Sequence, residues 1–342
     1  MEAFTPSTPD AGIPDHANGV TISQELHLKQ MELLHHYLTD TYATIAIRPQ
    51  GPPTQLFEVP KLALKHDYLL DTLLAITSLH IAKTRSEEAR KELVADAVRY
   101  QARALSSYRH SLANLTAEDC QALYHCSAKL GVIALGLRGV DPETAATRAT
   151  DTLVQLSQLW KGTWLILRAS RDLVDAETYD MLFQQPEWVQ PVRRPQPEAE
   201  RLLEMLRRRA KVDTPIDHEE SEKDTHGWEV GAPRSPPHFS DDDPSAIYLA
   251  TLDYLEILFR VYEPEPSRVL AWLVQVPAPF MEMVTFKDPL ASAICLLYAA
   301  TFQELSGKWW VQDFRRQLVE ELLPVVVATD PELAEVAHWV AS

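Results

Sequence analysis

Apolar residues recur along most of the chain at intervals of three to four, the spacing that places side chains on one side of an α-helix. The first such stripe follows Ser23 and extends to about Ile47, where Pro49, Pro52 and Pro53 end it. Residues 86–113 carry a second stripe among many charged residues. The pattern predicts amphipathic helices in the first half of the chain.

Residues 66–84 differ because they are apolar on all sides, which is typical of a helix buried at the centre of a domain. A helix beginning at Thr116 is predicted to end at Gly136 and Gly139, and two more are expected over about 142–159 and 160–169. After Pro244 the pattern predicts further helices over about 244–262, 265–275, 277–285, 288–305, 308–328 and 331–340. There is no β-hairpin signal and no internal repeat. The predicted fold is all-α: an irregular multi-helix domain around a central apolar helix, with a long disordered acidic loop.

The predicted helices divide the chain into two halves of one domain. Residues 1–22 are polar and contain three prolines, and we expect a disordered leader there. The first helical half covers 23–185, a Pro-rich, then basic, then acidic linker covers 186–243, and the second half covers 244–342. A short basic helix is expected inside the linker, over about 198–211.

Charge is concentrated in that linker. The chain of 342 residues has a net charge of −17, and residues 213–243 hold ten acidic and two basic residues, a local charge of −8. The remaining helical body is therefore only mildly acidic. A chain of this charge is not expected to grip nucleic acid directly, because phosphate binding needs clustered Lys and Arg. No run of 18 apolar residues predicts a membrane span.

The scarce glycines and cysteines narrow the function classes. Ten glycines, with no G-x-G-x-x-G and no G-x-x-x-x-G-K-[ST], argue against a nucleotide cofactor. The three cysteines are Cys120, Cys126 and Cys295. They are too few for a disulfide framework, so an intracellular protein is expected.

Several short segments, taken in order, resemble the regulatory domain of fungal zinc-cluster transcription factors of the sterol-uptake regulator type. The resemblance is carried by residues 31–37 (MELLHHY), 59–63 (VPKLA), 73–82 (LLAITSLHIA), 159–167 (LWKGTWLIL), 289–291 (PLA) and 308–310 (KWW). It extends over about 25–170 closely and over 245–340 more loosely. The family's zinc cluster needs six cysteines in two C-x2-C-x6-C-like halves, and this chain does not contain them.

The resemblance implies a transcription-regulator-like domain that binds a lipophilic small molecule, a sterol or a terpenoid or polyketide metabolite, without its own DNA-binding module. The implied protein partners are a full-length zinc-cluster regulator or a second copy of the chain, in the nucleus, the cytoplasm or both. The expected pocket is apolar and lined by aromatic residues of the last third. These are Trp272, Phe280, Tyr298, Trp309, Trp310 and Phe314, whose helical spacing is equally typical of a packed core.

The alternative function is a cofactor-independent cyclase or isomerase of fungal secondary metabolism that uses the same pocket. The general acid or base would then be His35, His36, His80 or Glu58. Histidines of this kind are also common as hydrogen-bonded packing residues. No serine-, cysteine- or zinc-hydrolase motif is present.

No metal site is predicted. Asp241, Asp242 and Asp243 begin like the D-D-x-x-D motif of terpene synthases, but Ser245 and Leu249 stand where further ligands are needed. The basic runs Arg193–Arg194 and Arg207–Arg209 are open to three interpretations: pairing with the acidic segment, a nuclear import signal or a nucleic-acid contact.

Overall fold

The computed structural model describes residues 16–45, 56–174, 197–212, 243–260 and 266–341. Every regular element in these ranges is a helix, which confirms the predicted all-α class. Most of the predicted leader and nearly all of the acidic segment lie outside the described residues, although the first helix already begins at His16.

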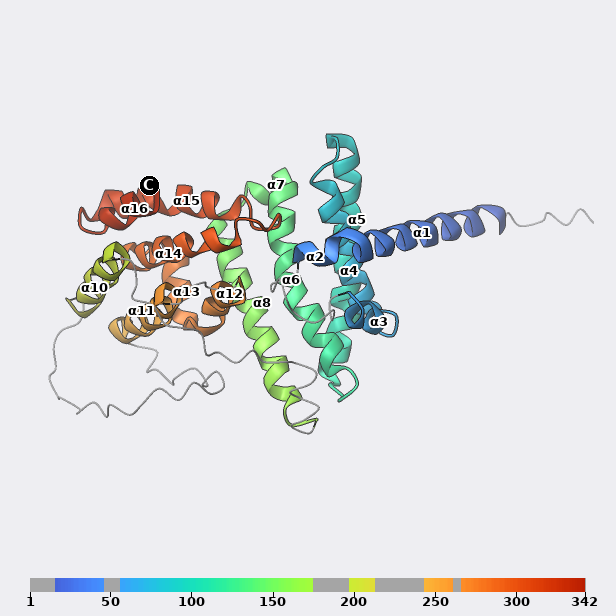
Figure 1. Cartoon of the computed structure of the whole chain (residues 1–342), viewed down its shortest axis with the longest axis horizontal. Coiled ribbons are helices and arrows are strands. Elements are labelled where there is room, and N and C mark those ends of the chain that lie inside the picture. The colour runs from blue at the N-terminus through green and yellow to red at the C-terminus, as the bar shows by residue number, and fades with distance from the viewer. Residues whose placement is uncertain (1–15, 46–55, 175–196, 213–242, 261–265, 342) are drawn as a thin grey trace, which may run out of the picture.

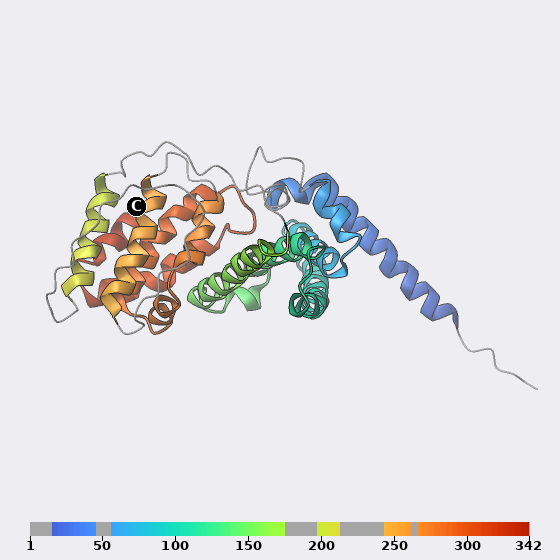
Figure 2. The same ribbon diagram turned by 90° about the horizontal axis from the view of Figure 1, so that it is seen from below.

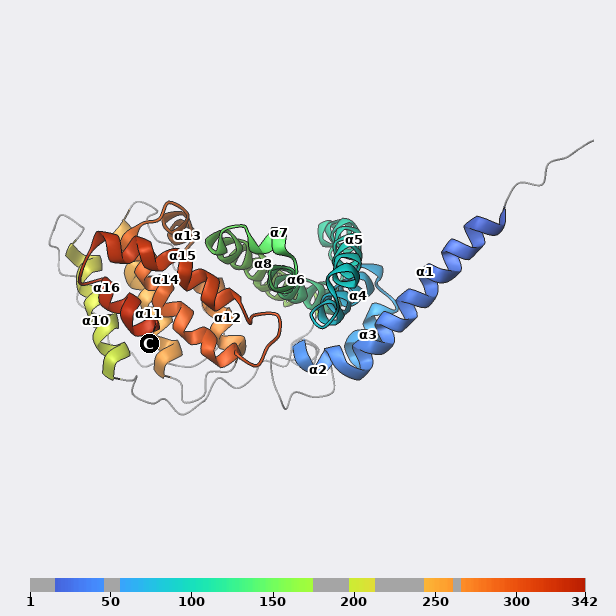
Figure 3. The same cartoon turned by 90° about the horizontal axis from the view of Figure 1, so that it is seen from above.

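The N-terminal half contains the helices before residue 171. They are α1 (His16–His36), the π-helical turn η1 (Tyr37–Thr41), α2 (Tyr42–Ile45), α3 (Glu58–Ala63), α4 (Asp67–Ala82), α5 (Glu87–Ala113), α6 (Cys120–Val140), α7 (Pro142–Ala145) and α8 (Ala149–Ser170). Figure 3 shows α1 projecting away from the body of the molecule.

Helix α4 is the central apolar helix that the sequence predicts. It packs against α5 and α6, and also against α1 and η1. Leu69, Leu73 and Leu79 are completely buried, and each such side chain contributes about 1.5–3 kcal/mol. The ion pair between Asp71 and Arg103 joins α4 to α5. The apolarity of α4 on all sides is therefore explained by neighbours on all sides.

Helices α6 and α8 form the next layer and pack tightly on each other. The hydroxyls of Ser127 and Thr163 are 2.7 Å apart across the contact. Gly131 of α6 lies directly under the indole of Trp160, and a Cβ at Gly131 would lie 2.7 Å from two of its ring carbons. Glycine is required here because the two helices approach too closely for a side chain.

We expect Gly131→Ala to lower the free energy of unfolding by about 1–2 kcal/mol, because the new methyl group overlaps the Trp160 ring. The better helix propensity of alanine offsets part of this loss. Gly162 in α8 is the matched control, because nothing lies within 4 Å of its Cβ position. There alanine should stabilise the protein by about 0.5–1 kcal/mol. Urea denaturation followed by circular dichroism measures both; the same sign for the two variants would contradict this account.

The C-terminal half is a separate group of helices (Figure 1). It consists of α10 (Pro197–Val212), α11 (Pro244–Arg260), α12 (Pro266–Gln275), α13 (Ala278–Thr285), α14 (Pro289–Thr301), the 3-10 turn η3 (Phe302–Leu305), α15 (Phe314–Thr329) and α16 (Ala334–Ala341). Helix α14 is its centre, with eleven buried residues among thirteen.

Helix α10 lies within the segment that the sequence assigns to the linker, yet it packs on α11 and α14. Its buried stripe includes Leu202 and Leu206, both fully covered. Beside this stripe, Arg207 pairs with Asp253 and Glu256 of α11 at 2.5 Å. Segment 197–212 is thus part of the second helical group, because a strongly amphipathic helix buries its apolar side.

The other arginines of this run, Arg208 and Arg209, also pair within the chain. Their partners are Glu332, at 3.6 Å, and Asp330. Both arginines therefore pair within the chain, but with partners outside residues 213–243. Pairing with the acidic segment, nearly all of which lies outside the described residues, stays a prediction. Arg193 and Arg194 lie outside the described residues.

The two halves meet along α6 and α8, which face α12, α13 and α15 (Figure 2). Glu321 of α15 accepts hydrogen bonds from the backbone N–H of Thr150, at 3.2 Å, and from that of Ala149. Its other oxygen accepts the Thr150 hydroxyl at 2.6 Å. A carboxylate is favourable there because it satisfies free N–H groups at the start of α8.

Among the described residues, no single helix is both long and apolar enough to cross a membrane; α13 with α14 and η3 passes that test only as a pair bent by 104°.

Candidate functional site

Three of the six aromatic residues predicted to line a pocket form one cluster. Trp272 of α12 stacks on Tyr298 of α14 with ring centroids 3.9 Å apart, and Phe280 of α13 meets Trp272 edge-on at 6.1 Å. The indole N–H of Trp272 donates to the Thr251 carbonyl at 3.3 Å, and the Tyr298 hydroxyl donates to the Val269 carbonyl at 2.8 Å. The three rings thus pack on one another, and the polar atoms of Trp272 and Tyr298 are hydrogen-bonded to backbone carbonyls.

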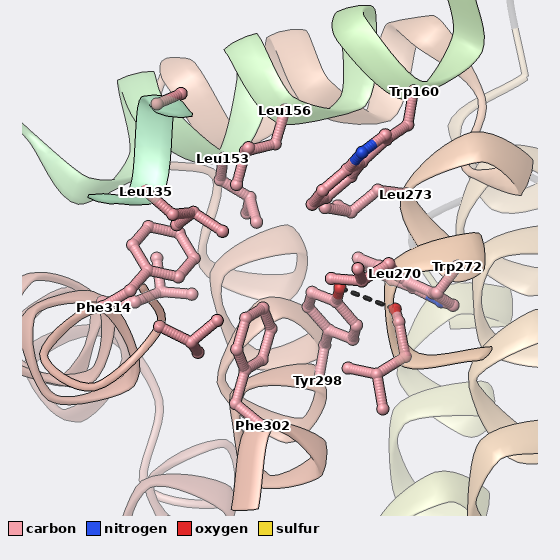
Figure 4. Packing of buried hydrophobic residues seen from close by; sticks show 14 of the residues in the cluster. Leu135, Leu153, Leu156, Trp160, Leu270, Trp272, Leu273, Tyr298, Phe302 and Phe314 are labelled. Carbon is pink, nitrogen blue, oxygen red and sulfur yellow. Dashed lines mark hydrogen bonds between the residues drawn. The ribbon is translucent and has the colours of Figure 1, made fainter. Parts of the chain in front are cut away.

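Phe314, the fourth of these residues, connects to the cluster through Phe302 (Figure 4). Figure 4 also shows Leu156 and Trp160 of α8 facing these rings from the N-terminal half. The cluster is therefore the apolar core of the junction between the halves. Its use by a ligand stays a prediction.

The tryptophan pair lies apart from this cluster. The Trp309 indole N–H donates to the Thr44 hydroxyl at 2.9 Å, and its ring is close to where a Cβ of Gly136 would be, at 3.2 Å. Trp310 is buried, and its indole nitrogen has no hydrogen-bond partner among the described residues. Trp309 thus brings the C-terminal half against α2, α4 and α6.

Two of the predicted acid–base candidates come together at this place. The ring centroids of His36 and His80 lie 5.5 Å apart, and those of His80 and Trp309 lie 5.2 Å apart. The Thr41 hydroxyl is 2.9 Å from Nδ1 of His80. The π-helical turn Tyr37–Thr41 places Thr41 there, and such turns are frequent at functional sites. We call His36, Thr41, His80 and Trp309 the histidine seam.

The other two acid–base candidates lie elsewhere. His35 is exposed on α1, and Glu58 is exposed in the first turn of α3. The geometry therefore concentrates any proton-transfer chemistry among these candidates on His36 and His80.

Burial lowers the pKa of His80 below the ordinary histidine value of 6.5, and the nearby His36 and Lys83 lower it further while Asp40 acts in the opposite direction. At neutral pH the ring is uncharged, so Nδ1 either accepts from the Thr41 hydroxyl or donates to it, depending on the tautomer. Since the unfolded chain binds this proton more readily, His80 stabilises the fold above pH 6.5 and loses that contribution as the pH falls through its folded pKa.

We expect the unfolding free energy of the wild type to fall more steeply than that of His80→Asn between pH 7.5 and pH 5, because asparagine keeps a hydrogen-bonding group near Thr41 but does not titrate. Denaturant titrations at several pH values measure the difference. His35→Asn, at an exposed position on α1, is the control and should follow the wild type. Parallel curves for wild type and His80→Asn would contradict the assignment.

The sequence analysis missed a polar group on α6. His125 and Lys129, one helical turn apart, are only 6% and 5% exposed. We call these two residues the α6 basic face. Burial lowers the pKa of Lys129 from 10.5 to about 8 and holds the pKa of His125 well below 6.5. The available signal was that Lys129 is the one charged residue between Asp119 and Arg138.

Metal binding has no support among the described residues, where no group of three or more His, Cys, Asp or Glu side chains could hold an ion. All three cysteines are buried thiols. Asp241 and Asp242 lie outside the described residues.

No protein-family model matches the chain. The chain is similar to Sterol uptake control protein 2 of Saccharomyces cerevisiae, with 32% identity over 83 residues. The similar region spans 23% of this chain and only 9% of that protein. This partial similarity supports a loose link to fungal regulators.

Proposed function

We propose that this chain is a regulatory domain that binds a lipophilic small molecule and acts through protein partners. The observation that carries the proposal is the 83-residue similarity to a protein named for the control of sterol uptake. A sterol is therefore the first ligand class to test, followed by terpenoid and polyketide metabolites. The chain contains three cysteines and so lacks the six that a fungal zinc cluster needs.

The way in which the two halves meet supports a regulatory role. Apolar side chains of both halves share one core at the junction (Figure 4), and polar contacts from α15 fasten the start of α8. A ligand that prefers one arrangement of the halves would shift their equilibrium by its difference in affinity. The surface offered to a partner, a full-length zinc-cluster regulator or a second copy, would change with it. Residence in the nucleus, the cytoplasm or both is part of this proposal.

Native mass spectrometry of the full chain purified from a fungal host tests ligand binding. We expect an added mass that organic extraction removes and identifies as a lipid. A ligand-free mass, together with no binding of ergosterol in titration, would overturn the proposal. Fusion of the chain to a heterologous DNA-binding domain tests the regulatory part, because reporter output should then change with the supply of the identified lipid.

The histidine seam favours a second candidate, a cofactor-independent cyclase or isomerase. A half-buried histidine that is neutral at pH 7 and donates its Nδ1–H to the Thr41 hydroxyl has Nε2 free to act as a general base beside the Trp309 ring. Turnover of terpenoid or polyketide intermediates by the purified chain, abolished in His80→Asn, would support it. Ligand binding without turnover would exclude it.

A further inference from the structure

The α6 basic face holds a positive charge without a counter-charge. Lys129 is almost fully buried, and no carboxylate among the described residues lies within salt-bridge distance of its amine. The nearby group that affects it is the Cys126 thiol, whose own pKa burial raises to about 11. The thiol is therefore neutral at pH 7, and it hydrogen-bonds with Thr72 at 3.2 Å. An ammonium buried in this way is costly unless an anion pairs with it.

His125, one turn away, has an unsatisfied ring nitrogen. Its Nε2 is buried and has no hydrogen-bond partner among the described residues, and its ring lies edge-on to Tyr124 at 5.3 Å. Since the ring is neutral at pH 7, one tautomer presents Nε2–H as a donor. An N–H donor and an ammonium at positions i and i+4 point to the same side of the helix. A buried ring N–H without a partner, beside a nearly buried ammonium that no carboxylate of the described residues pairs with, indicates a missing acceptor on this side of α6.

The same side of α6 continues with apolar residues. Val132 follows Lys129 at three residues, and Gly136 follows at seven, where the ring of Trp309 approaches. Val132 is 4% exposed. These surroundings favour a ligand with an apolar body over a hydrated inorganic anion.

We propose that Lys129 and His125 bind the carboxylate of a lipophilic acid. One carboxylate oxygen pairs with the Lys129 ammonium and the other accepts from Nε2–H of His125. The pairing supplies the counter-charge that Lys129 lacks. This inference rests on the proposed lipophile-binding function and names the ligand class for this site.

Titration of the full chain with the fluorescent fatty acid cis-parinaric acid and with its methyl ester tests the inference. We expect the wild type to bind the acid about tenfold or more tightly than the ester. Lys129→Met should lose about tenfold or more in affinity for the acid and leave that for the ester unchanged. His125→Leu should lower the affinity for the acid. His125→Gln, whose side-chain amide can donate in place of Nε2–H, should keep part of that affinity.

Lys161→Met is the matched control. Lys161 lies on the neighbouring helix α8, and burial lowers the pKa of its amine as well. The Lys161→Met variant should bind the acid as tightly as the wild type does. Lys129→Met should also raise the thermal midpoint of the ligand-free protein, since it removes a buried charge. That gain, together with the loss of acid binding, would exclude misfolding as the cause.

Equal affinity of the wild type for acid and ester would overturn the inference, as would unchanged acid binding in Lys129→Met or an equal loss in Lys161→Met. The proposed function fails separately. If ergosterol or the ester binds without any preference for the acid, only the carboxylate assignment is wrong. If ergosterol, acid and ester all fail to bind, lipophile binding itself is wrong.

Discussion

Arg138→Met is expected to lower the free energy of unfolding by about 3–5 kcal/mol, because it removes a buried hub of hydrogen bonds. Arg138, at the end of α6, is 4% exposed. Its guanidinium donates to the Thr147 carbonyl at 2.9 Å, to the Thr152 hydroxyl at 3.1 Å and to Gln317 of α15. Methionine has a similar volume but leaves these acceptors without a donor.

The planar, five-donor guanidinium explains why arginine stands at position 138. Further bonds reach the carbonyls of Thr144, Ala145 and Arg148, each at 3.4 Å, so one side chain holds α7 and the start of α8 against α6. Arg138→Lys keeps the charge and should recover only part of the stability.

Arg148→Met is the control for this prediction. Arg148 carries the same charge nearby but forms an exposed ion pair with Asp151, so its loss should cost less than about 1 kcal/mol. Guanidinium denaturation of the three variants measures these differences. A loss below 1 kcal/mol in Arg138→Met would show that the hub does not hold the junction.

The helices were predictable where local pattern and tertiary packing agree. Helix α4 is the clearest case, because a segment apolar on all sides must lie among other helices. The end of α6 was predicted wrongly: the helix continues through Gly136 and Gly139 to Val140. Gly136 does not end the helix; its missing side chain makes room for Trp309 and Leu79. A glycine that allows close packing and one that ends a helix look the same in a single sequence.

The sites were less predictable because their residues meet only in the fold. His36 and His80 were recognised as candidates, but their proximity depends on the π-helical turn and on packing between segments 44 residues apart. Lys129 was not recognised as a candidate because the sequence alone does not show whether a single lysine in an apolar helix reaches solvent or is buried. Glu321 and Arg138 likewise look like ordinary surface charges until α15 is placed on α8.

Trp272→Ala is expected to cost about 3–5 kcal/mol in unfolding free energy, because it removes a large, fully packed side chain from the junction core. Trp272 is 2% exposed, stacks on Tyr298 at 3.9 Å and donates to the Thr251 carbonyl. Alanine would leave a cavity between α11, α12 and α14 and an unpaired carbonyl. Trp272→Phe keeps most of the ring contact and should lose about 1–2 kcal/mol, mainly for the missing indole N–H.

The comparison of these two variants also decides what the aromatic cluster does. Truncating a side chain that fills a core lowers the unfolding free energy of the protein, whether or not a ligand is present. Truncating a side chain that lines an open pocket instead lowers the ligand affinity and changes the unfolding free energy little. Chemical denaturation of the ligand-free protein and of protein saturated with its lipid separates the two cases. The stacking of Trp272 on Tyr298 and their hydrogen bonds to backbone carbonyls lead us to expect the first result. A cost below 1 kcal/mol with weakened lipid binding would instead assign the cluster to the ligand.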